Sequence, residues 1–486
     1  MLLKSWFWLL YIVFLQVYKQ AIESLRPSST DTWPLYLNHA SLACLPNSCS
    51  RHNTPSQAHA LTKLVKGFSS GSDEYIVIVC EYKDAFASAC AVARAFPLYN
   101  RKAKYSGSGH TVTVEFVLLN ADGHKTTALR DSDVECLTVA AEGIRLAAKI
   151  VDMPCSEMNT DAFLQEIHKV GDALGIKPEV IRGQDLAKRG FGGIYSVGQA
   201  AEHPPALAIL SHTDPDAEET IAWVGKGIVY DTGGLCIKSK TSMAGMKRDC
   251  GGAAAILGAF YVAVKLGFQE NLHAIFCLAE NAVGPKAVRP DDIITMYSGR
   301  TVEINNTDAE GRLVLGDGVA YAEKDLNATT ILDMATLTGA QGTATGRYHA
   351  ALLTNSEEWE KAAVKAGQIS GDLVHPVPYT PEIHFNEFAS NIADMKNSVA
   401  DRSNAQPSCA GLFVGAQIGF DYEGYWIHVD MASPVHCGDR ATGYGVALLT
   451  TLFGHASDNS LLQMLSPHME AEGNGMESAS KKIRLE

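Results

Sequence analysis

Residues 305–313 read NNTDAEGRL, and this stretch lies between a predicted strand and a predicted helix. The preceding TVEI (301–304) is typical of a strand, and the apolar stretch GRLVLGDGVAYAEKDL (311–326) predicts a helix. Two acids and an arginine therefore lie at the turn between the two elements. That arrangement indicates either a charged surface loop or half of a metal site.

Other strands and helices around this junction are indicated by apolar runs. Strands are predicted at 206–211, 221–230, 272–279, 329–335 and 425–432. The small apolar residues of 251–267 predict a helix between two of these strands. Because the strand runs are continuously apolar and do not alternate, both faces of their sheet should be covered.

The length of 486 residues favours two domains over a single core. Strand-like runs at 75–80 and 112–119 flank a helical run at 84–96, so the first part is itself α/β. The predicted fold class is α/β: a smaller N-terminal α/β domain followed by a larger catalytic α/β/α domain with a central mixed sheet. We expect an N-terminal domain, a linker helix, the larger domain and a polar tail at residues 21–150, 151–170, 171–455 and 456–486.

Residues 1–20 form an apolar N-terminal segment of uncertain role. Fourteen uncharged residues lie between Lys4 and Lys19, fewer than the ~20 that span a bilayer but enough for a signal-peptide core. A buried or amphipathic first helix is the alternative. The sequon at Asn305 lies inside the opening motif, where a glycan would obstruct any site. We therefore expect a cytoplasmic protein, with the secretory pathway as the alternative if residues 1–20 act as a signal.

Composition narrows the possible partners. The formal charge of −14, with no large basic block, disfavours nucleic acid as a partner. The terminal KKIRLE leaves an additional nuclear location open. No membrane partner is expected unless the N-terminal segment is a signal or anchor. The 11 cysteines are scattered and are typical of reduced intracellular thiols.

Three segments at predicted strand ends carry polar residues that a plain core would exclude. They are 224–238, 243–255 and the opening stretch, and their charged residues are Lys226, Asp231, Lys238, Asp249, Asp308, Glu310 and Arg312. Four carboxylates buried together would be very costly without compensation. Either the three cations pair with them in an ion network, or divalent metals bind their oxygen atoms. Spacing alone leaves both interpretations open.

NTDAEGRL (306–313) resembles the signature of the leucyl (cytosol) aminopeptidase family. The resemblance continues, in the same order along the chain, at VGKGIVYDTGG, MKRDCGGAAA, DMATLTGA (333–340) and ATGYGVALL (441–449). Within the family the chain is most similar to the animal branch of probable aminopeptidase-like proteins. The resemblance implies that residues 171–455 form a two-metal aminopeptidase catalytic domain.

A two-metal centre of Zn²⁺, Mn²⁺ or both is what this resemblance implies. One metal would be held by Lys226, Asp231, Asp249 and Glu310, and the other by Asp231, Asp308 and Glu310. Lys226 would have to bind as the neutral amine, which a neighbouring dication permits. The two metals would activate a bridging water or hydroxide.

Further roles follow from the same resemblance. Lys238 would polarise the scissile carbonyl, and Arg312 would hold a bicarbonate ion as the general base. Substrate would be bound by Met246, Thr336, Leu337 and Gly339. The implied reaction is removal of the N-terminal residue from peptides with a free α-amine, by a homohexamer. The alternatives are a catalytically weak or inactive peptide-binding scaffold of the same family, and another two-metal hydrolase such as a phosphoesterase.

Overall fold

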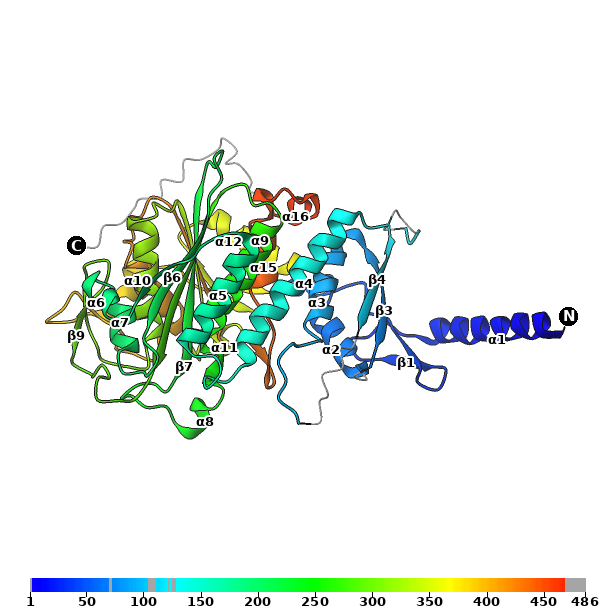
Figure 1. The fold of residues 1–486 in the computed structure, drawn as a ribbon, viewed down its shortest axis with the longest axis horizontal. Helices are drawn as coiled ribbons and strands as arrows, with labels where there is room; N and C mark the ends of the chain where they lie inside the picture. The colour runs from blue at the N-terminus through cyan, green and yellow to red at the C-terminus, as the bar shows by residue number, and fades with distance from the viewer. Residues whose placement is uncertain (1, 70–71, 104–110, 121, 125–127, 468–486) are drawn as a thin grey trace.

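A computed structural model describes residues 2–69, 72–103, 111–120, 122–124 and 128–467, with side chains from residue 13 onward. The chain forms a smaller N-terminal part and a larger second part, connected through the long helix α4 (Asp131–Asp152). Figure 1 shows the smaller part, in blue, on the right and the larger part on the left. The predicted α/β fold class is confirmed.

An eight-stranded mixed sheet forms the centre of the larger part. Its order is β13-β12-β15-β11-β7-β8-β6-β5. The strands are β5 (Glu179–Arg182), β6 (Ala206–His212), β7 (Thr220–Asp231), β8 (Asn271–Asn281), β11 (Thr330–Ala335), β12 (Ala350–Thr354), β13 (Val374–Pro376) and β15 (Tyr425–Asp430). The four central strands β15, β11, β7 and β8 are parallel, whereas β6 and β12 are antiparallel to their inner neighbours.

The five apolar runs of the second part that were predicted as strands form β6, β7, β8, β11 and β15. The other three strands of the sheet, β5, β12 and β13, were not predicted. They have three to five residues each, too few for a hydrophobic period to be recognised.

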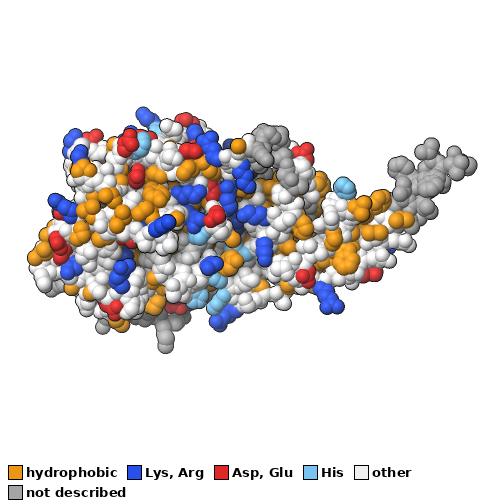
Figure 2. Space-filling model, turned by 90° about the horizontal axis from the view of Figure 1, so that it is seen from below, with side chains coloured by type: hydrophobic (Ala, Val, Ile, Leu, Met, Phe, Trp, Pro, Cys, Tyr) orange, Lys and Arg blue, Asp and Glu red, His pale blue; other side chains and the backbone are white. Residues whose placement is uncertain are grey.

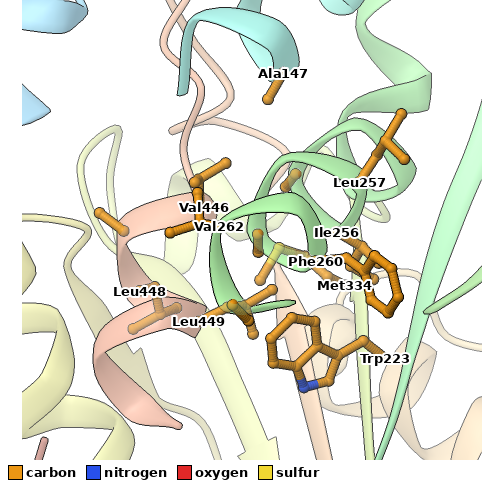
Figure 3. Close-up of a cluster of buried hydrophobic side chains, with 14 of the residues drawn as sticks. Ala147, Trp223, Ile256, Leu257, Phe260, Val262, Met334, Val446, Leu448 and Leu449 are labelled. Carbon is orange, nitrogen blue, oxygen red and sulfur yellow. The ribbon is translucent and has the colours of Figure 1, made fainter. Parts of the chain in front are cut away.

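Helices cover both faces of the sheet. One face carries α4, α5 (Thr160–Leu174), α9 (Gly251–Lys265), α12 (Glu357–Ser370), α15 (Val446–Leu452) and α16 (Ser460–Leu465). The other carries α6 (Gln184–Lys188), α7 (Gly192–Gly198), α10 (Gly311–Lys324) and α14 (Gln406–Gly415). Figure 3 shows α9 between the sheet residue Trp223 and side chains of α15, with Ala147 of α4 above it. The prediction of a doubly covered sheet is confirmed.

Helix α16 lies inside the range expected to be a polar tail. Leu461, Leu462 and Leu465 are all at most 4% exposed and pack into the core on the α9 side. Residues 460–465 therefore belong to the folded part. The predicted polar tail is therefore wrong for residues 460–465, where three buried leucines hold a helix against the core, and residues 468–486 of that tail lie outside the described residues.

The N-terminal part contains the parallel pair β3 (Glu74–Glu81) and β4 (Val112–Leu119), with α2 (Ala58–Phe68) and α3 (Ala85–Ala93) against it. Before them come α1 (Leu2–Ser24) and the hairpin of β1 (Thr32–Leu35) and β2 (Ala40–Ala43). Helix α1 projects away from the body of the molecule (Figure 1). No helix in the described ranges combines the length and apolarity that crossing a bilayer requires.

Short elements complete the larger part. They are α8 (Lys240–Met243), α11 (Gln341–Ala344), α13 (Pro381–His384), β9 (Ile293–Thr295), β10 (Thr301–Glu303), β14 (Met395–Lys396), β16 (His436–Cys437), β17 (Arg440–Ala441) and the 3₁₀ turns η2 (Met246–Cys250), η3 (Phe385–Phe388) and η4 (Gly454–Ala456). A further 3₁₀ turn, η1 (Tyr82–Asp84), joins β3 to α3 in the N-terminal part. Strand β10 precedes the opening motif, as predicted from TVEI. The turn η2 leads directly into α9.

Candidate functional site: a buried centre of four carboxylates

The three polar segments come together at the C-terminal ends of the central parallel strands. Lys226 and Asp231 lie on β7, Asp249 lies in η2, and Glu310 immediately precedes α10. Carboxyl ends of parallel strands meet at one edge of a sheet, where helices begin, and this edge is the usual place for a site. Carboxylate oxygens of Asp231, Asp308 and Glu310 lie within 4.8 Å of one another.

An irregularity in β7 brings Lys226 and Asp231 to the same side of the sheet. Side chains alternate between faces along a strand, so residues five positions apart normally point to opposite faces. Pairing with β8 proceeds from Ile228 with Ala279 to Asp231 with Asn281, so β7 has one extra residue there. This bulge shifts the alternation by one position, and Asp231 faces the same centre as Lys226.

Two lysines occupy positions between the acids. Lys226 Nζ lies 2.8 Å from Asp249 Oδ1 and 2.9 Å from Glu310 Oε1. Lys238 Nζ lies 2.8 Å from Asp231 Oδ2 and 2.5 Å from Asp308 Oδ1. Each ammonium group thus pairs with two carboxylates from different segments.

These ion pairs do not fully compensate the acids. Four carboxylates face two ammonium groups, so two negative charges remain if every group is ionised. Asp249 Oδ2 and Glu310 Oε2 are buried without a hydrogen-bond partner. Burial, with Asp231 nearby, raises the pKa of Glu310 to about 8. Burial also raises the pKa of Asp249. Excess negative charge and unpartnered oxygen atoms fit divalent cations, which oxygen ligands suit.

Lys226 is held in a protonated form by this arrangement. Burial lowers its pKa, but Asp249, Glu310 and Asp231 outweigh burial and raise the pKa above its usual value. Its ammonium group also donates to the backbone oxygen of Thr336 at 3.0 Å. The ammonium group of Lys226 supplies positive charge among the buried carboxylates. A metal ion beside it would lower the pKa of Lys226 and favour the neutral amine.

Arg312 does not join the ion network, contrary to one of the two interpretations from spacing. Among the described residues it has no carboxylate within 4.0 Å, and its Nη1 donates to the backbone oxygen of Asn397 at 3.0 Å. Its Nε is buried without a partner, and the guanidinium lies 5.8 Å from the ring centroid of Phe388. Burial lowers the pKa of Arg312 to about 10. The arginine is thus a buried cation with unused donor capacity.

The predicted substrate-binding residues lie on two segments beside the centre. Thr336 follows β11, and its hydroxyl donates to Asp249 Oδ1 at 2.8 Å. The Leu337 N–H donates to Asp430 Oδ1 at 3.0 Å. A side chain added at Gly339 would meet open space. Met246 is half-buried and lies three residues before Asp249 in η2.

Two asparagines that support the centre were not predicted. Asn281, at the end of β8, donates to Asp231 Oδ1 at 2.8 Å and to the Thr307 backbone oxygen at 3.0 Å. Asn397 accepts from the N–H of Asn305 and donates to backbone oxygens within 306–309. Asn281 could have been predicted as a site residue, because it lies at the end of a strand that neighbours β7. Nothing in the sequence marks Asn397.

Family models match both parts of the chain. Residues 145–450 match "Cytosol aminopeptidase family, catalytic domain", and residues 13–105 match "M17 aminopeptidase N-terminal domain 2". The chain belongs to the cytosol aminopeptidase family. It is therefore an enzyme of the leucyl aminopeptidase type, as the resemblance implied. The N-terminal match begins inside the apolar segment 1–20, part of which thus belongs to the family's N-terminal domain.

Individual members of the cytosol aminopeptidase family are similar over most of the chain. "Probable aminopeptidase NPEPL1" of Homo sapiens is 61% identical over 476 residues, covering 97% of this chain and 90% of that protein. "Leucine aminopeptidase 1" of Caenorhabditis elegans is 48% identical, over 88% of this chain and 87% of that protein.

Solved structures of family members share the fold. The Caenorhabditis elegans leucine aminopeptidase structure matches with a TM-score of 0.85 at 46% identity, covering 89% of this chain and 88% of that one. The Trypanosoma brucei leucyl aminopeptidase structure, in complex with bestatin, matches with a TM-score of 0.80 at 39% identity, covering 89% and 85%.

Proposed function

We propose that this protein is a metal-dependent aminopeptidase that hydrolyses the N-terminal peptide bond of peptides with a free α-amine. The main support for this proposal is the buried centre of four carboxylates, in which one oxygen of Asp249 and one of Glu310 have no hydrogen-bond partner. Lys226, Asp231, Asp249 and Glu310 would hold one divalent metal, and Asp231, Asp308 and Glu310 the other. Bound Zn²⁺ or Mn²⁺ would supply Lewis-acid activation of water and a ligand position for the substrate's α-amine.

Lys238 is proposed to stabilise negative charge on the substrate. Its ammonium group lies at the centre's edge, between Asp231 and Asp308, and these acids raise its pKa although burial lowers it. It therefore stays charged at neutral pH. A charged donor beside the scissile bond favours the oxyanion that forms when the carbonyl is attacked.

Arg312 is proposed to hold a bicarbonate ion that acts as the general base. Support comes from its free donor capacity, because its Nε is buried without a partner and no carboxylate neutralises it among the described residues. A guanidinium binds a planar oxyanion through two parallel hydrogen bonds. The anion would then lie next to Glu310, two residues before it in the chain.

Substrate positioning is assigned to the segment after β11 and to η2. The backbone of Thr336, Leu337 and Gly339 would bind the peptide, and the hydrogen bond from the Leu337 N–H to Asp430 Oδ1 fixes the conformation of this segment. Met246 would line the pocket for the first side chain. The open space at Gly339 leaves room for the peptide backbone to approach.

An inactive peptide-binding scaffold remains the second candidate. It would need the fold and the acids, but it would have no use for Lys238 and Arg312 as buried, charged groups that bind no metal. Retention of both favours the enzyme.

The test is a peptidase assay of the protein reconstituted with Mn²⁺ or Zn²⁺. We expect cleavage of a free leucyl peptide and no cleavage of the same peptide after N-acetylation. Cleavage of both peptides would contradict recognition of the α-amine. Cleavage of neither would favour the scaffold.

A cytoplasmic homohexamer is part of the same proposal. Asn305 Nδ2 donates to the Ser398 backbone oxygen at 3.1 Å and its Oδ1 accepts from the Ser398 N–H at 2.9 Å, so a glycan on Nδ2 would crowd a side chain that is already engaged. Endoglycosidase treatment of the native protein should leave its mobility unchanged. Sedimentation equilibrium should give six times the 52.2 kDa chain mass.

A further inference from the structure

The segment that forms one wall of the centre is strongly basic. Residues 238–248 read KSKTSMAGMKR and carry four cations and no acid, in a chain whose formal charge is −14. The segment begins at Lys238, which contacts two of the acids, and ends one residue before Asp249. Every cation of the segment therefore lies within a few residues of Lys238 or Asp249 in the sequence.

Three of these cations have little or no acidic compensation. Lys240 is exposed in α8 and forms no salt bridge with a described residue. Lys247 donates to the backbone oxygen of Asp152. Arg248 donates to the Gly438 backbone oxygen at 3.2 Å, and its nearest acid, Asp439, is 3.9 Å away and fully exposed.

A second group of cations adjoins this wall. Lys247 of the wall, together with Lys66 and Arg440, is near enough to the single buried carboxyl group of Asp152 to lower its pKa. Burial raises the pKa of Asp152, and the three cations act in the opposite direction. Arg440 forms a 3.0 Å ion pair with it, yet Arg440 Nε has no hydrogen-bond partner. Three positive charges against one negative charge leave a positive surplus.

This surplus lies on the face that carries the strand ends. Helix α8 lies at the lower edge in Figure 1, and Figure 2 views the molecule from that side. Figure 2 shows Lys and Arg side chains gathered over the middle of this face, with few acids among them. An acidic protein thus presents a basic surface around its buried acidic centre.

We infer that this basic rim, formed by Lys240, Lys247, Arg248 and Arg440, selects peptides that carry negative charge on the C-terminal side of the scissile bond. The inference rests on the proposed aminopeptidase function and names its substrate class. A short acidic peptide is itself dipolar, because its α-amine is positive and its far end is negative. The centre would bind the amine end of such a peptide, and the basic rim would attract its negative end.

The basic rim affects the rate at which the peptide meets the enzyme and the affinity of their complex more than it affects the rate of bond cleavage. Exposed charges steer an oppositely charged ligand and are screened by salt. The preference should therefore appear in KM and kcat/KM, should weaken at high ionic strength, and should leave kcat nearly unchanged.

The test compares two peptides on the Mn²⁺-loaded full-length protein. Leu-Ala-Glu-Glu and its uncharged counterpart Leu-Ala-Gln-Gln-amide differ only in negative charge beyond the cleaved bond. At low salt we expect kcat/KM to favour the acidic peptide by roughly 3- to 10-fold, the size that a few partly exposed charge pairs give. The preference should shrink towards equality at ~0.5 M NaCl, where the Debye length is a few ångströms.

Variants locate the preference on the rim. Lys240→Gln and Arg248→Gln should each lower kcat/KM for the acidic peptide and leave the amide peptide's kcat unchanged. Lys265→Gln makes the same charge change at the far end of α9 and serves as the control. Equal loss of the preference in Lys265→Gln would overturn the inference in favour of a net-charge effect. Cleavage of both peptides at equal rates by the wild type would overturn it and leave the proposed function standing, whereas cleavage of neither would refute both.

Discussion

At Gly311, the first residue of α10, the chain has no room for a side chain. A Cβ there would lie 2.5 Å from Lys226 Cε and 2.6 Å from its Nζ. The Lys226 side chain lies against the helix at this point, and its position between Asp249 and Glu310 depends on that contact. A methyl group would displace the amine from the acids.

We predict that Gly311→Ala lowers kcat by at least about tenfold, because a displacement of about 1 Å in a site can cost far more than that. Metal content measured by mass spectrometry should fall as well. Gly67→Ala, where an added Cβ meets nothing within 4 Å, is the matched control and should leave both quantities unchanged. Wild-type activity in Gly311→Ala would mean that Lys226 is not a ligand.

Glu310 makes metal binding depend on pH. Its pKa of about 8 lies above the usual 4.5, so the metal-free protein keeps a proton there at neutral pH. A metal must displace that proton and the one on Lys226, so affinity should rise as pH increases through about 8. We predict a larger Mn²⁺-induced rise in Tm at pH 8.5 than at pH 6.5.

The same side chain supplies a direct test of the bridging role. Glu310→Gln removes the charge and keeps the shape, so it should lower metal content and abolish turnover while the far-ultraviolet circular dichroism spectrum stays native. It should also reduce the pH dependence of the Mn²⁺ shift. Unchanged metal content in this variant would contradict the proposed ligand set.

At the scale of elements, the irregular segment around β14 holds the opening motif in place. Asn397 is fully buried and forms hydrogen bonds with the backbone of residues 305, 306 and 309, while its own backbone oxygen accepts from Arg312. Removing its amide would leave several buried backbone groups without partners.

We predict that Asn397→Ala destabilises the protein by about 2–4 kcal/mol, since each buried group left unsatisfied costs about 1–3 kcal/mol. Chemical denaturation measures that change. The turnover of the folded fraction should fall too, because the loop carrying Asp308 and Glu310 loosens. Asn404→Ala, which removes one bond to Glu387 at a less buried position, should have a small effect on both.

The elements differed in how far the sequence predicted them. Long apolar strands such as β7 and β8 were predictable because a continuous apolar run of this length can form few structures other than a buried strand. Short strands such as β13 depend on pairing with β12 and leave no local pattern. The support from the side chains of Asn281 and Asn397 was missed for the same reason, since their partners lie 26 to 92 positions away in the chain.

For the site, sequence resemblance supplied the candidate ligands but not their geometry. It did not reveal that each lysine pairs with two acids, nor that Arg312 contacts none of them within 4.0 Å. Charge balance in a buried cluster depends on distances, and spacing along the chain does not fix them.

At the scale of the whole molecule, histidines lie where the two parts meet. The His52 and His375 rings are 5.1 Å apart, and His349 Nε2 lies 2.9 Å from the His52 backbone oxygen. His59 packs against Tyr348. Burial, with Arg94 and His349 nearby, lowers the pKa of His59 to about 4.

Stability should therefore fall in mild acid. The unfolded chain binds a proton at His59 from about pH 6.5 downward, whereas the folded chain resists it until about pH 4, so stability is lost between these values. For His59 alone the loss is about 2 kcal/mol at pH 5. Urea unfolding at pH 7 and pH 5 should show a loss smaller by about that amount in His59→Gln than in the wild type. Identical losses in the two proteins would contradict the assignment.

The bulge in β7 has a consequence for how relatives of this enzyme are judged. Removing one residue at position 229 or 230 would restore regular pairing with β8 and turn Asp231 to the opposite side of the sheet. Every ligand would still be present and in the correct order. A gene could thus lose the activity through a single-codon deletion that an inventory of conserved residues would score as intact, and the number of residues between Lys226 and Asp231 is as diagnostic as their identity.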